Sequence, residues 1–194
     1  MNNILSVDVE DWFHILELSS TPSLGEWDLL ESRVEKNFHM LLDQFDRNNV
    51  KATCFFLGWL AEKKPKLVRE AEHRGHEIAS HGHAHQLIYT QTREQFRNDI
   101  RKSKNILEQI TGKSVHGYRA PGFSITKETL WALEELVAAG YTYDSSIFPT
   151  KRGHGGLSEA PVYPHVITTK RGPILEFPIS VANVFGRRMC FFGG

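Results

Sequence analysis

The sequence predicts an α/β fold built around parallel strands. Short apolar runs, rich in β-branched and aromatic residues, alternate with longer segments of helical period along the 194 residues. A repeated strand–helix–strand order of this kind produces a parallel sheet with crossover helices. Either a doubly wound sheet or a (β/α) barrel fits this order, and in both folds chemistry collects at the carboxyl ends of the strands.

The predicted strands are short apolar runs bounded by proline, glycine or polar residues. The segment 50–58, "VKATCFFLG", is typical because β-branched and aromatic residues dominate it. Between the last two strands, the segment 151–164 is rich in glycine, proline and histidine, so a long loop is expected there. Strands are expected at residues 3–9, 50–58, 76–81, 115–121, 141–148 and 174–180.

The predicted helices carry apolar residues at helical spacing and have recognisable ends. In the first, the apolar residues from Val34 to Phe45 share one face. Thr92 and Gln95 have the spacing of a capping box at the start of the third helix. Helices are expected at residues 33–49, 64–75, 92–113 and 126–140.

The composition is that of one globular domain spanning residues 1–194, with 40% hydrophobic and 24% charged residues. Basic and acidic residues number 23 each, so no basic stripe indicates a nucleic-acid partner. The N-terminus lacks the features of a secretory signal and no apolar run could span a membrane, so a cytoplasmic location is expected. Cys54 and Cys190 lack CxxC spacing, which argues against a disulfide framework or a thiolate zinc site.

Ionisable side chains lie at or near the ends of four of the predicted strands. Because the carboxyl ends of parallel strands lie at the same rim, these side chains are expected to form one site. They are Asp8, Glu10 and Asp11 after the first strand, the cluster from His81 to His85 after the third, Arg119 in the fourth and Asp144 in the fifth.

The histidine cluster predicts a metal centre. His81 and His85 are four residues apart, so a turn could aim both imidazoles at one ion while His83 points elsewhere. Two imidazoles and a carboxylate bind a divalent metal that keeps open positions, and zinc, cobalt and nickel all suit this set. A second carboxylate nearby could take a proton from metal-bound water.

Each of these residues also has a purely structural interpretation. A single His-x3-His pair is a weak signal, and "DVED" alone is more often a strand end or a helix cap. Asp144 precedes two serines and has the character of a turn former. Trp12, Phe13 and Trp131 fit core or rim packing better than a sugar platform. The functional prediction depends on all the motifs occurring together at successive strand ends.

The motifs "SVDVED", "SHGHAH" and "YRAPGF" occur in this order over nearly the whole chain. They resemble the NodB-homology polysaccharide deacetylases of carbohydrate esterase family 4, in the branch related to peptidoglycan deacetylases and exosortase-associated proteins. The resemblance implies a distorted (β/α) barrel and metal-dependent hydrolysis of N-acetyl groups on amino sugars of a polysaccharide. An N-acetylated polysaccharide or oligosaccharide is therefore the expected partner, and a divalent metal, zinc in the first place, the expected cofactor.

The resemblance also implies roles for particular residues. Asp8 resembles the catalytic base, and Arg119 the residue that orients it through charge-assisted hydrogen bonds. His81 and His85 resemble the metal-binding imidazoles. The carboxylate ligand is placed at Asp11 in preference to Glu10. Both are retained, because strand alternation favours Glu10 and a bulge or turn would bring in Asp11.

One element of the family pattern is missing. The family has a histidine, the general acid, on a late strand, whereas residues 174–194 contain none, and His154 and His165 lie in the wrong part of the pattern. The ending "CFFGG" predicts that the chain is a truncated form of a longer enzyme. An incomplete barrel would expose apolar edges and favour self-association into a homo-oligomer.

The sequence thus leaves two other functions open. The first is an amidase that acts on a small cyclic amide or ureide, as some relatives do. The second is a catalytically silent carbohydrate-binding protein, which the missing late histidine suggests.

Overall fold

The computed structural model describes residues 4–16, 21–151 and 153–190. The described residues form two compact units, one lying within 1–85 and 102–115 and the other within 86–101 and 116–194. Position 3 of the first predicted strand and most of the "CFFGG" ending lie outside the described residues. The sequence predicts that residues 1–194 form a single domain with a barrel. Both predictions depend on how the two units combine, so both stay predictions.

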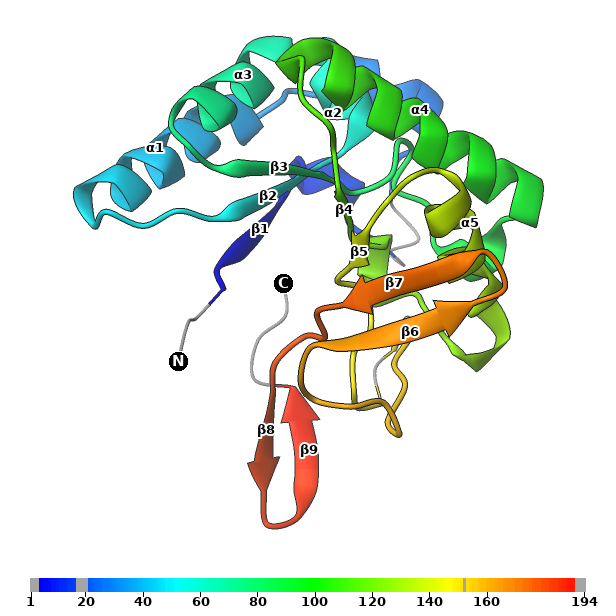
Figure 1. Cartoon of the computed structure of the whole chain (residues 1–194). Coiled ribbons are helices and arrows are strands. Elements are labelled where there is room, and N and C mark those ends of the chain that lie inside the picture. The colour runs from blue at the N-terminus through cyan, green and yellow to red at the C-terminus, as the bar shows by residue number, and fades with distance from the viewer. Residues whose placement is uncertain (1–3, 17–20, 152, 191–194) are drawn as a thin grey trace. The chain divides into compact units, whose positions relative to one another are not determined.

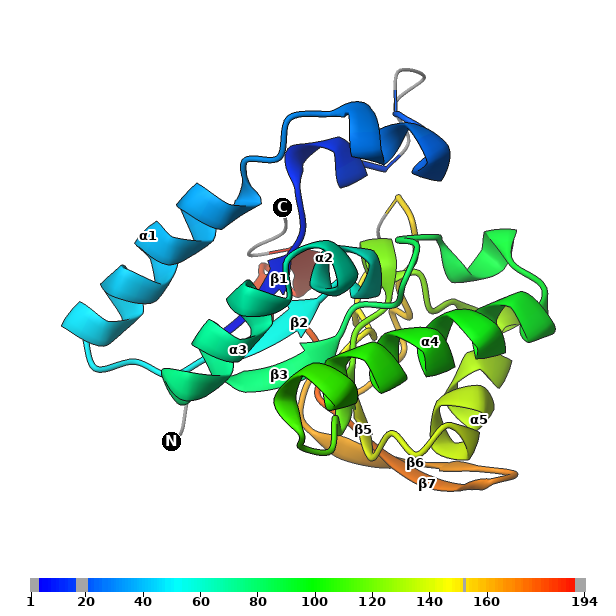
Figure 2. The same ribbon diagram turned by 90° about the horizontal axis from the view of Figure 1, so that it is seen from above.

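The first unit is built on three parallel strands in the order β1-β2-β3 (Figure 1). Their register pairs Val7 with Cys54 and Cys54 with Ile78. Figures 1 and 2 show the three helices of this unit on one side of the strands. The elements are β1 Ser6–Val9, α1 Val34–Arg47, β2 Thr53–Phe56, α2 Gly58–Lys63, α3 Pro65–His73 and β3 Glu77–Ser80.

The apolar face of α1 packs against these strands, as its spacing predicts. Val34, Phe38, Leu42 and Phe45 are buried, and the ring of Phe38 lies 5.4 Å from that of Phe56. Burial of such side chains contributes about 1.5–3 kcal/mol each and holds the helix on the sheet. Cys54 is a free thiol in this core, and burial raises its pKa to about 12.

The second unit has β4, β5 and β7 parallel to one another and β6 antiparallel to β7. A separate hairpin pairs β8 with β9 (Figure 1). Helix α4 begins in the second unit and ends in the first. The elements are α4 Arg93–Thr111, β4 Gly117–Tyr118, α5 Trp131–Ala138, β5 Tyr143–Asp144, β6 His165–Thr169, β7 Gly172–Glu176, β8 Val181–Val184 and β9 Arg187–Cys190.

Contacts within the second unit join the start of α4 to α5. Arg93 Nε and Arg97 Nε donate to the carboxylate of Glu135 over 2.5 and 2.6 Å. The predicted capping box is confirmed, since Thr92 N donates to Gln95 Oε1 and Gln95 N to Thr92 Oγ1. The capping box marks the start of α4, and the ion pairs join its first turns to α5.

The mixed α/β fold with mostly parallel strands is confirmed. The sequence interpretation missed the short α2, the antiparallel strand β6 and the β8–β9 hairpin. The segment 151–164 forms no helix or strand in its described part, as predicted. In the described part of the chain, no helix has both the length and the apolar character needed to cross a membrane.

Candidate functional site

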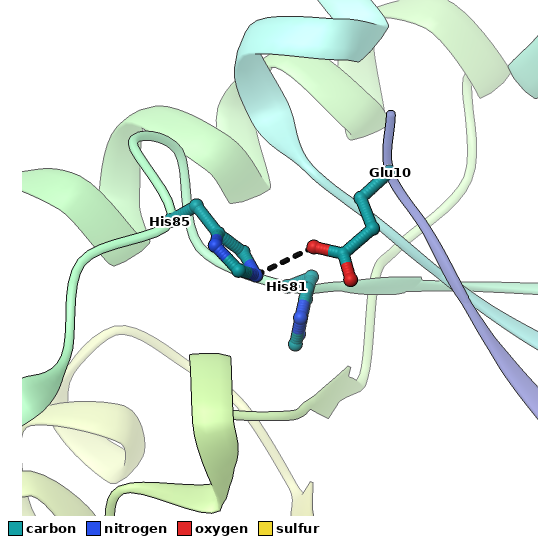
Figure 3. A group of neighbouring side chains, drawn as sticks. All are labelled: Glu10, His81 and His85. Carbon is teal, nitrogen blue, oxygen red and sulfur yellow. Dashed lines mark ion pairs between the residues drawn. The ribbon is translucent and has the colours of Figure 1, made fainter. Parts of the chain in front are cut away.

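Three potential metal ligands meet at the carboxyl ends of β1 and β3 in the first unit. Glu10 follows β1, while His81 and His85 follow β3. One ligand atom from each side chain lies within 4.8 Å of the other two. Figure 3 shows the three side chains pointing into one small space, and Glu10 Oε2 lies 2.6 Å from His85 Nε2. We name these three residues the metal triad.

Local backbone structure explains why the two imidazoles converge. The backbone N–H of His81 donates to Phe56 O and so extends the pairing with β2. The chain then turns at Gly82, with a φ of 75°, and again at His85, with a φ of 50°. Glycine tolerates this left-handed conformation freely, whereas a histidine there costs free energy, which is characteristic of functional sites.

The histidine between them points elsewhere, as the sequence predicts. His83 Nε2 lies 2.9 Å from Glu62 Oε2, so its ring contacts α2 instead of the metal triad. The backbone of this loop is tied to the same helix, because Gly58 N donates to Gly82 O and Trp59 N to His83 O. A helix that the sequence interpretation missed therefore supports the histidine loop.

The structure places Glu10, and not Asp11, beside the imidazoles. The Asp11 carboxylate accepts hydrogen bonds from the backbone N–H groups of Trp12, Arg33 and Val34. It thereby caps the short 3-10 helix Trp12–His14 and the start of α1. The expected preference for Asp11 is corrected by this geometry: the chain turns after Glu10, and backbone donors already occupy the Asp11 oxygens.

The electrostatics of the triad favour an ionised carboxylate. Burial raises the pKa of Glu10, but the hydrogen bond and positive charge of His85 outweigh it and hold the pKa below its ordinary value. Carboxylate oxygen and imidazole nitrogen are ligands that zinc and similar divalent ions bind. His85 Nδ1 is buried and has no hydrogen-bond partner among the described residues. The donor set therefore fits a divalent metal ion.

His14 is a neighbour of the triad that the sequence interpretation missed. Its ring lies 5.9 Å from the ring of His85 and 4.3 Å from that of Trp27. Its Nδ1 accepts a hydrogen bond from Asp11 N. Burial, and then the charge of His85, lowers the pKa of His14 to about 4, so the ring is neutral at neutral pH. The signal was present in the sequence as "DWFH", directly after the acidic motif.

Asp8, the predicted base, lies on β1 opposite Phe55 of β2. It is half-buried and lines a cavity of about 330 Å³ together with Glu10, Trp12 and Arg33. Phe13 is buried in the core, as predicted, whereas Trp12 is 46% exposed. Asp8 and Glu10 thus border the same cavity, and the role of Asp8 as a base stays a prediction.

The other predicted residues lie in the second unit. Arg119 is buried after β4, and its Nε donates to Ser145 O while its Nη2 donates to Ser145 Oγ. Asp144 is fully buried and accepts a hydrogen bond from Ser146 Oγ. Glu176, at the end of β7, pairs in register with Asp144 and was missed. An acid inside the apolar run "ILEFPI" was the signal that could have revealed it.

The family follows from comparison with known proteins. A family model described as polysaccharide deacetylase matches residues 28–143, well over half of the 194 residues. The chain belongs to the polysaccharide deacetylase family. A second model, described as a domain of unknown function (DUF3473), matches residues 145–194. The predicted resemblance to the NodB and carbohydrate esterase 4 deacetylases is thereby confirmed.

Individual relatives support this assignment. A peptidoglycan-N-acetylglucosamine deacetylase from Bacillus cereus is 35% identical over 96 residues, which are 49% of this chain and 35% of that protein. The crystal structure of a predicted polysaccharide deacetylase from Mycobacterium smegmatis superposes with a TM-score of 0.71 at 23% identity, covering 91% of this chain and 58% of that one. The chain therefore spans about a third of this curated relative.

A further solved structure has the same fold. It is a family 4 carbohydrate esterase from Bacillus anthracis that is termed a pseudoenzyme, with a TM-score of 0.53 and 16% identity over 69% of this chain and 40% of that one. The family as a whole is metal-dependent, and the metal triad is a site that could hold the ion. These findings agree with the chemistry of the residues at the ends of β1 and β3.

Proposed function

We propose that the protein is a metal-dependent deacetylase that hydrolyses N-acetyl groups on the amino sugars of a polysaccharide. The observation that carries this proposal is the convergence of Glu10, His81 and His85, from the ends of β1 and β3 on either side of β2, in a member of this family. Relatives named as peptidoglycan-N-acetylglucosamine and peptidoglycan-N-acetylmuramic acid deacetylases support an amino-sugar polymer as the substrate class. An exopolysaccharide has the same N-acetyl chemistry.

The metal triad would hold the ion in this proposal. When bound, a divalent ion supplies Lewis acidity, which polarises an acetyl carbonyl and makes a bound water more acidic. Zinc is the first choice, and cobalt and nickel suit the same ligands. The buried His14 ring next to His85 stays neutral, so it adds no positive charge that would repel the cation.

Asp8 is the proposed general base. It lies two residues before Glu10 at the end of β1, and a carboxylate there could accept the proton of the attacking water. Addition of water to the amide and cleavage of its C–N bond yield acetate and a free amine, which must gain a proton. The proposed role of Arg119 is to orient the base, which stays a prediction because the two residues belong to different units.

Acetate release from N-acetylglucosamine oligomers tests the proposal. Protein loaded with zinc, cobalt or nickel should release acetate, Asp8→Asn should keep its metal but lose activity, and His85→Ala should lose both. His83→Ala is the matched control, because this histidine lies in the same loop but contacts Glu62. Acetate release that is independent of both Asp8 and the metal would contradict the proposal.

A catalytically silent carbohydrate-binding protein is the second candidate. Oligosaccharide binding by calorimetry without acetate release, from metal-loaded protein, would support this candidate. Turnover of a small cyclic amide in the same preparations would instead support an amidase.

A cytoplasmic location and self-association stay predictions, which fractionation and light scattering would test.

A further inference from the structure

The second unit contains two fully buried acids on neighbouring strands. Asp144 ends β5 and Glu176 ends β7, and the two residues are direct partners in the parallel register. Ser146 donates to both carboxylate oxygens of Asp144, from Oγ over 2.6 Å and from N over 3.2 Å. Glu176 Oε1 accepts a hydrogen bond from Ile147 N over 3.0 Å. Both acids therefore bind the segment that directly follows β5.

The burial and register of the pair disfavour two negative charges side by side. Glu176 Oε2 is buried and accepts no hydrogen bond from the described residues, and Asp144 is its acidic neighbour. Burial, and then the charge of Asp144, raises the pKa of Glu176 well above its ordinary value. Burial also raises the pKa of Asp144, although Glu176, Ser146 and the charge of Arg119 oppose the rise. A proton on Glu176 would let its Oε2 donate toward Asp144.

The segment bound by the two acids also holds Arg119. Ser145 O accepts from Arg119 Nε over 3.1 Å, and Ser145 Oγ accepts from Arg119 Nη2 over 2.9 Å. Ser145 Oγ in turn donates to Phe177 O, the residue after Glu176. On the other side, Ser146 Oγ accepts from Ala120 N while it donates to Asp144. The segment 145–147 thus links the acid pair to the guanidinium group: Ser146 and Ile147 donate to the acids, and Ser145, next to them in the chain, accepts from Arg119.

We propose that Glu176, together with its register partner Asp144, is a positioning residue for Arg119. The pair fixes Ser146 and Ile147, and the two oxygen atoms of the adjacent Ser145 fix the guanidinium. Glu176 belongs to the 145–194 segment that matches a family of unknown function, and the proposal assigns one task to that segment. The catalytic consequence rests on the proposed deacetylase function, whereas the positioning itself does not.

An ionised Glu176 acting as a ligand or base is the competing explanation. It requires a bare carboxylate next to a second carboxylate in a site that is 0% exposed. The charged and titratable groups that act on the pair are Arg119, whose positive charge favours ionisation of both acids, and Tyr118, which lies near Asp144. One guanidinium balances one carboxylate, so the second acid keeps its proton.

Comparison of Glu176→Gln with Glu176→Ala separates the two explanations. Glutamine mimics a protonated glutamic acid, because its amide oxygen can accept from Ile147 N and its NH₂ can donate to Asp144. Exchange of the Arg119 Nε proton with water, followed by NMR, reports the guanidinium position without any need for activity. We expect slow exchange in wild type and in Glu176→Gln, and fast exchange in Glu176→Ala.

Activity and metal content complete the test. Because misplacement of a catalytic group costs up to about a hundredfold, Glu176→Ala should lower kcat by roughly tenfold to a hundredfold with metal content unchanged, and Glu176→Gln should restore it. Wild type should lose activity at alkaline pH as Glu176 ionises, whereas Glu176→Gln should not. If Glu176→Ala does not fold, Ser146→Ala removes the link between Asp144 and Ala120 and should also speed the exchange.

Two results would overturn the inference: Glu176→Gln as impaired as Glu176→Ala, or exchange at Arg119 that no variant changes. A wild type that releases no acetate, with the expected exchange pattern, would refute the deacetylase proposal and leave the positioning role intact. An active wild type in which substitution of Glu176 leaves the Arg119 exchange unchanged would refute the positioning role and leave the deacetylase proposal intact. The two proposals can therefore fail separately.

Discussion

The substitution Glu10→Gln tests the metal triad most directly. It removes one negative charge and nearly preserves the size of the side chain. In the metal-free protein it breaks the 2.6 Å ion pair between Glu10 and His85. The Glu10 side chain is 33% exposed and the His85 side chain is 5% exposed. With metal present it removes the only carboxylate of the triad. The two effects are measured separately, without and with added metal.

The structure sets the expected size of each effect. The ion pair is partly buried, so its loss should cost about 1–2 kcal/mol, between the values for exposed and buried pairs. A metal at a hundred times its Kd stabilises the folded state by about 2.7 kcal/mol. For a chain of this size, that corresponds to a rise in Tm of roughly 5–11 °C. Glu10→Gln should lose most of this rise.

Thermal unfolding followed by circular dichroism measures both effects, on chelator-treated protein and during zinc titration, with metal content from elemental analysis. The matched control is Glu62→Gln, because Glu62 forms the same type of pair with His83 outside the triad. It should cost less than about 1 kcal/mol and keep the full response to metal. The reasoning is refuted if Glu10→Gln retains the bound metal and the full Tm rise, or if Asp11→Asn abolishes both instead.

Three further predictions concern stability. Burial and the charge of His85 lower the pKa of His14 from 6.5 to about 4 in the folded protein. Between these pH values the unfolded chain binds a proton that the folded chain does not, so the free energy of unfolding should fall as the pH drops from 6.5 to about 4. Denaturant titrations should show a flatter pH profile for His14→Gln. Arg97 and Arg93 lower the pKa of Glu135 from 4.5 to about 2, so its stabilisation is present above pH 4.5 and disappears as the pH falls through 2. Glu135→Gln should therefore cost about 1–2 kcal/mol at pH 7, and an unchanged free energy of unfolding would contradict this. An added Cβ at Gly155 would lie 2.1 Å from Phe123 O, so Gly155→Ala should lower the free energy of unfolding by more than about 1 kcal/mol. Gly153→Ala is the neutral control, because a Cβ there would have no atom within 4 Å. Equal stability of the two variants would count against the packing described.

Much of the fold could be predicted because local patterns determine local structure. The apolar spacing of α1, the capping box at Thr92 and the short runs that became β1, β2 and β3 each depend on residues close together in the chain. The strand–helix order then implies parallel pairing. The antiparallel β6 was missed because its residues, "HVITT", follow a loop segment and pair with β7 through a turn that periodicity does not reveal.

The sequence by itself determined that two histidines and an acidic motif follow two strands of an α/β fold, and that His83 points away from its neighbours. Only the tertiary structure decided which carboxylate joins the imidazoles. Glu10 and Asp11 are adjacent acids with similar chemistry, and their roles separate because backbone N–H groups at Arg33 and Val34, more than twenty residues away, occupy Asp11. The partnership of Asp144 and Glu176 likewise depends on strand register, which no local pattern encodes.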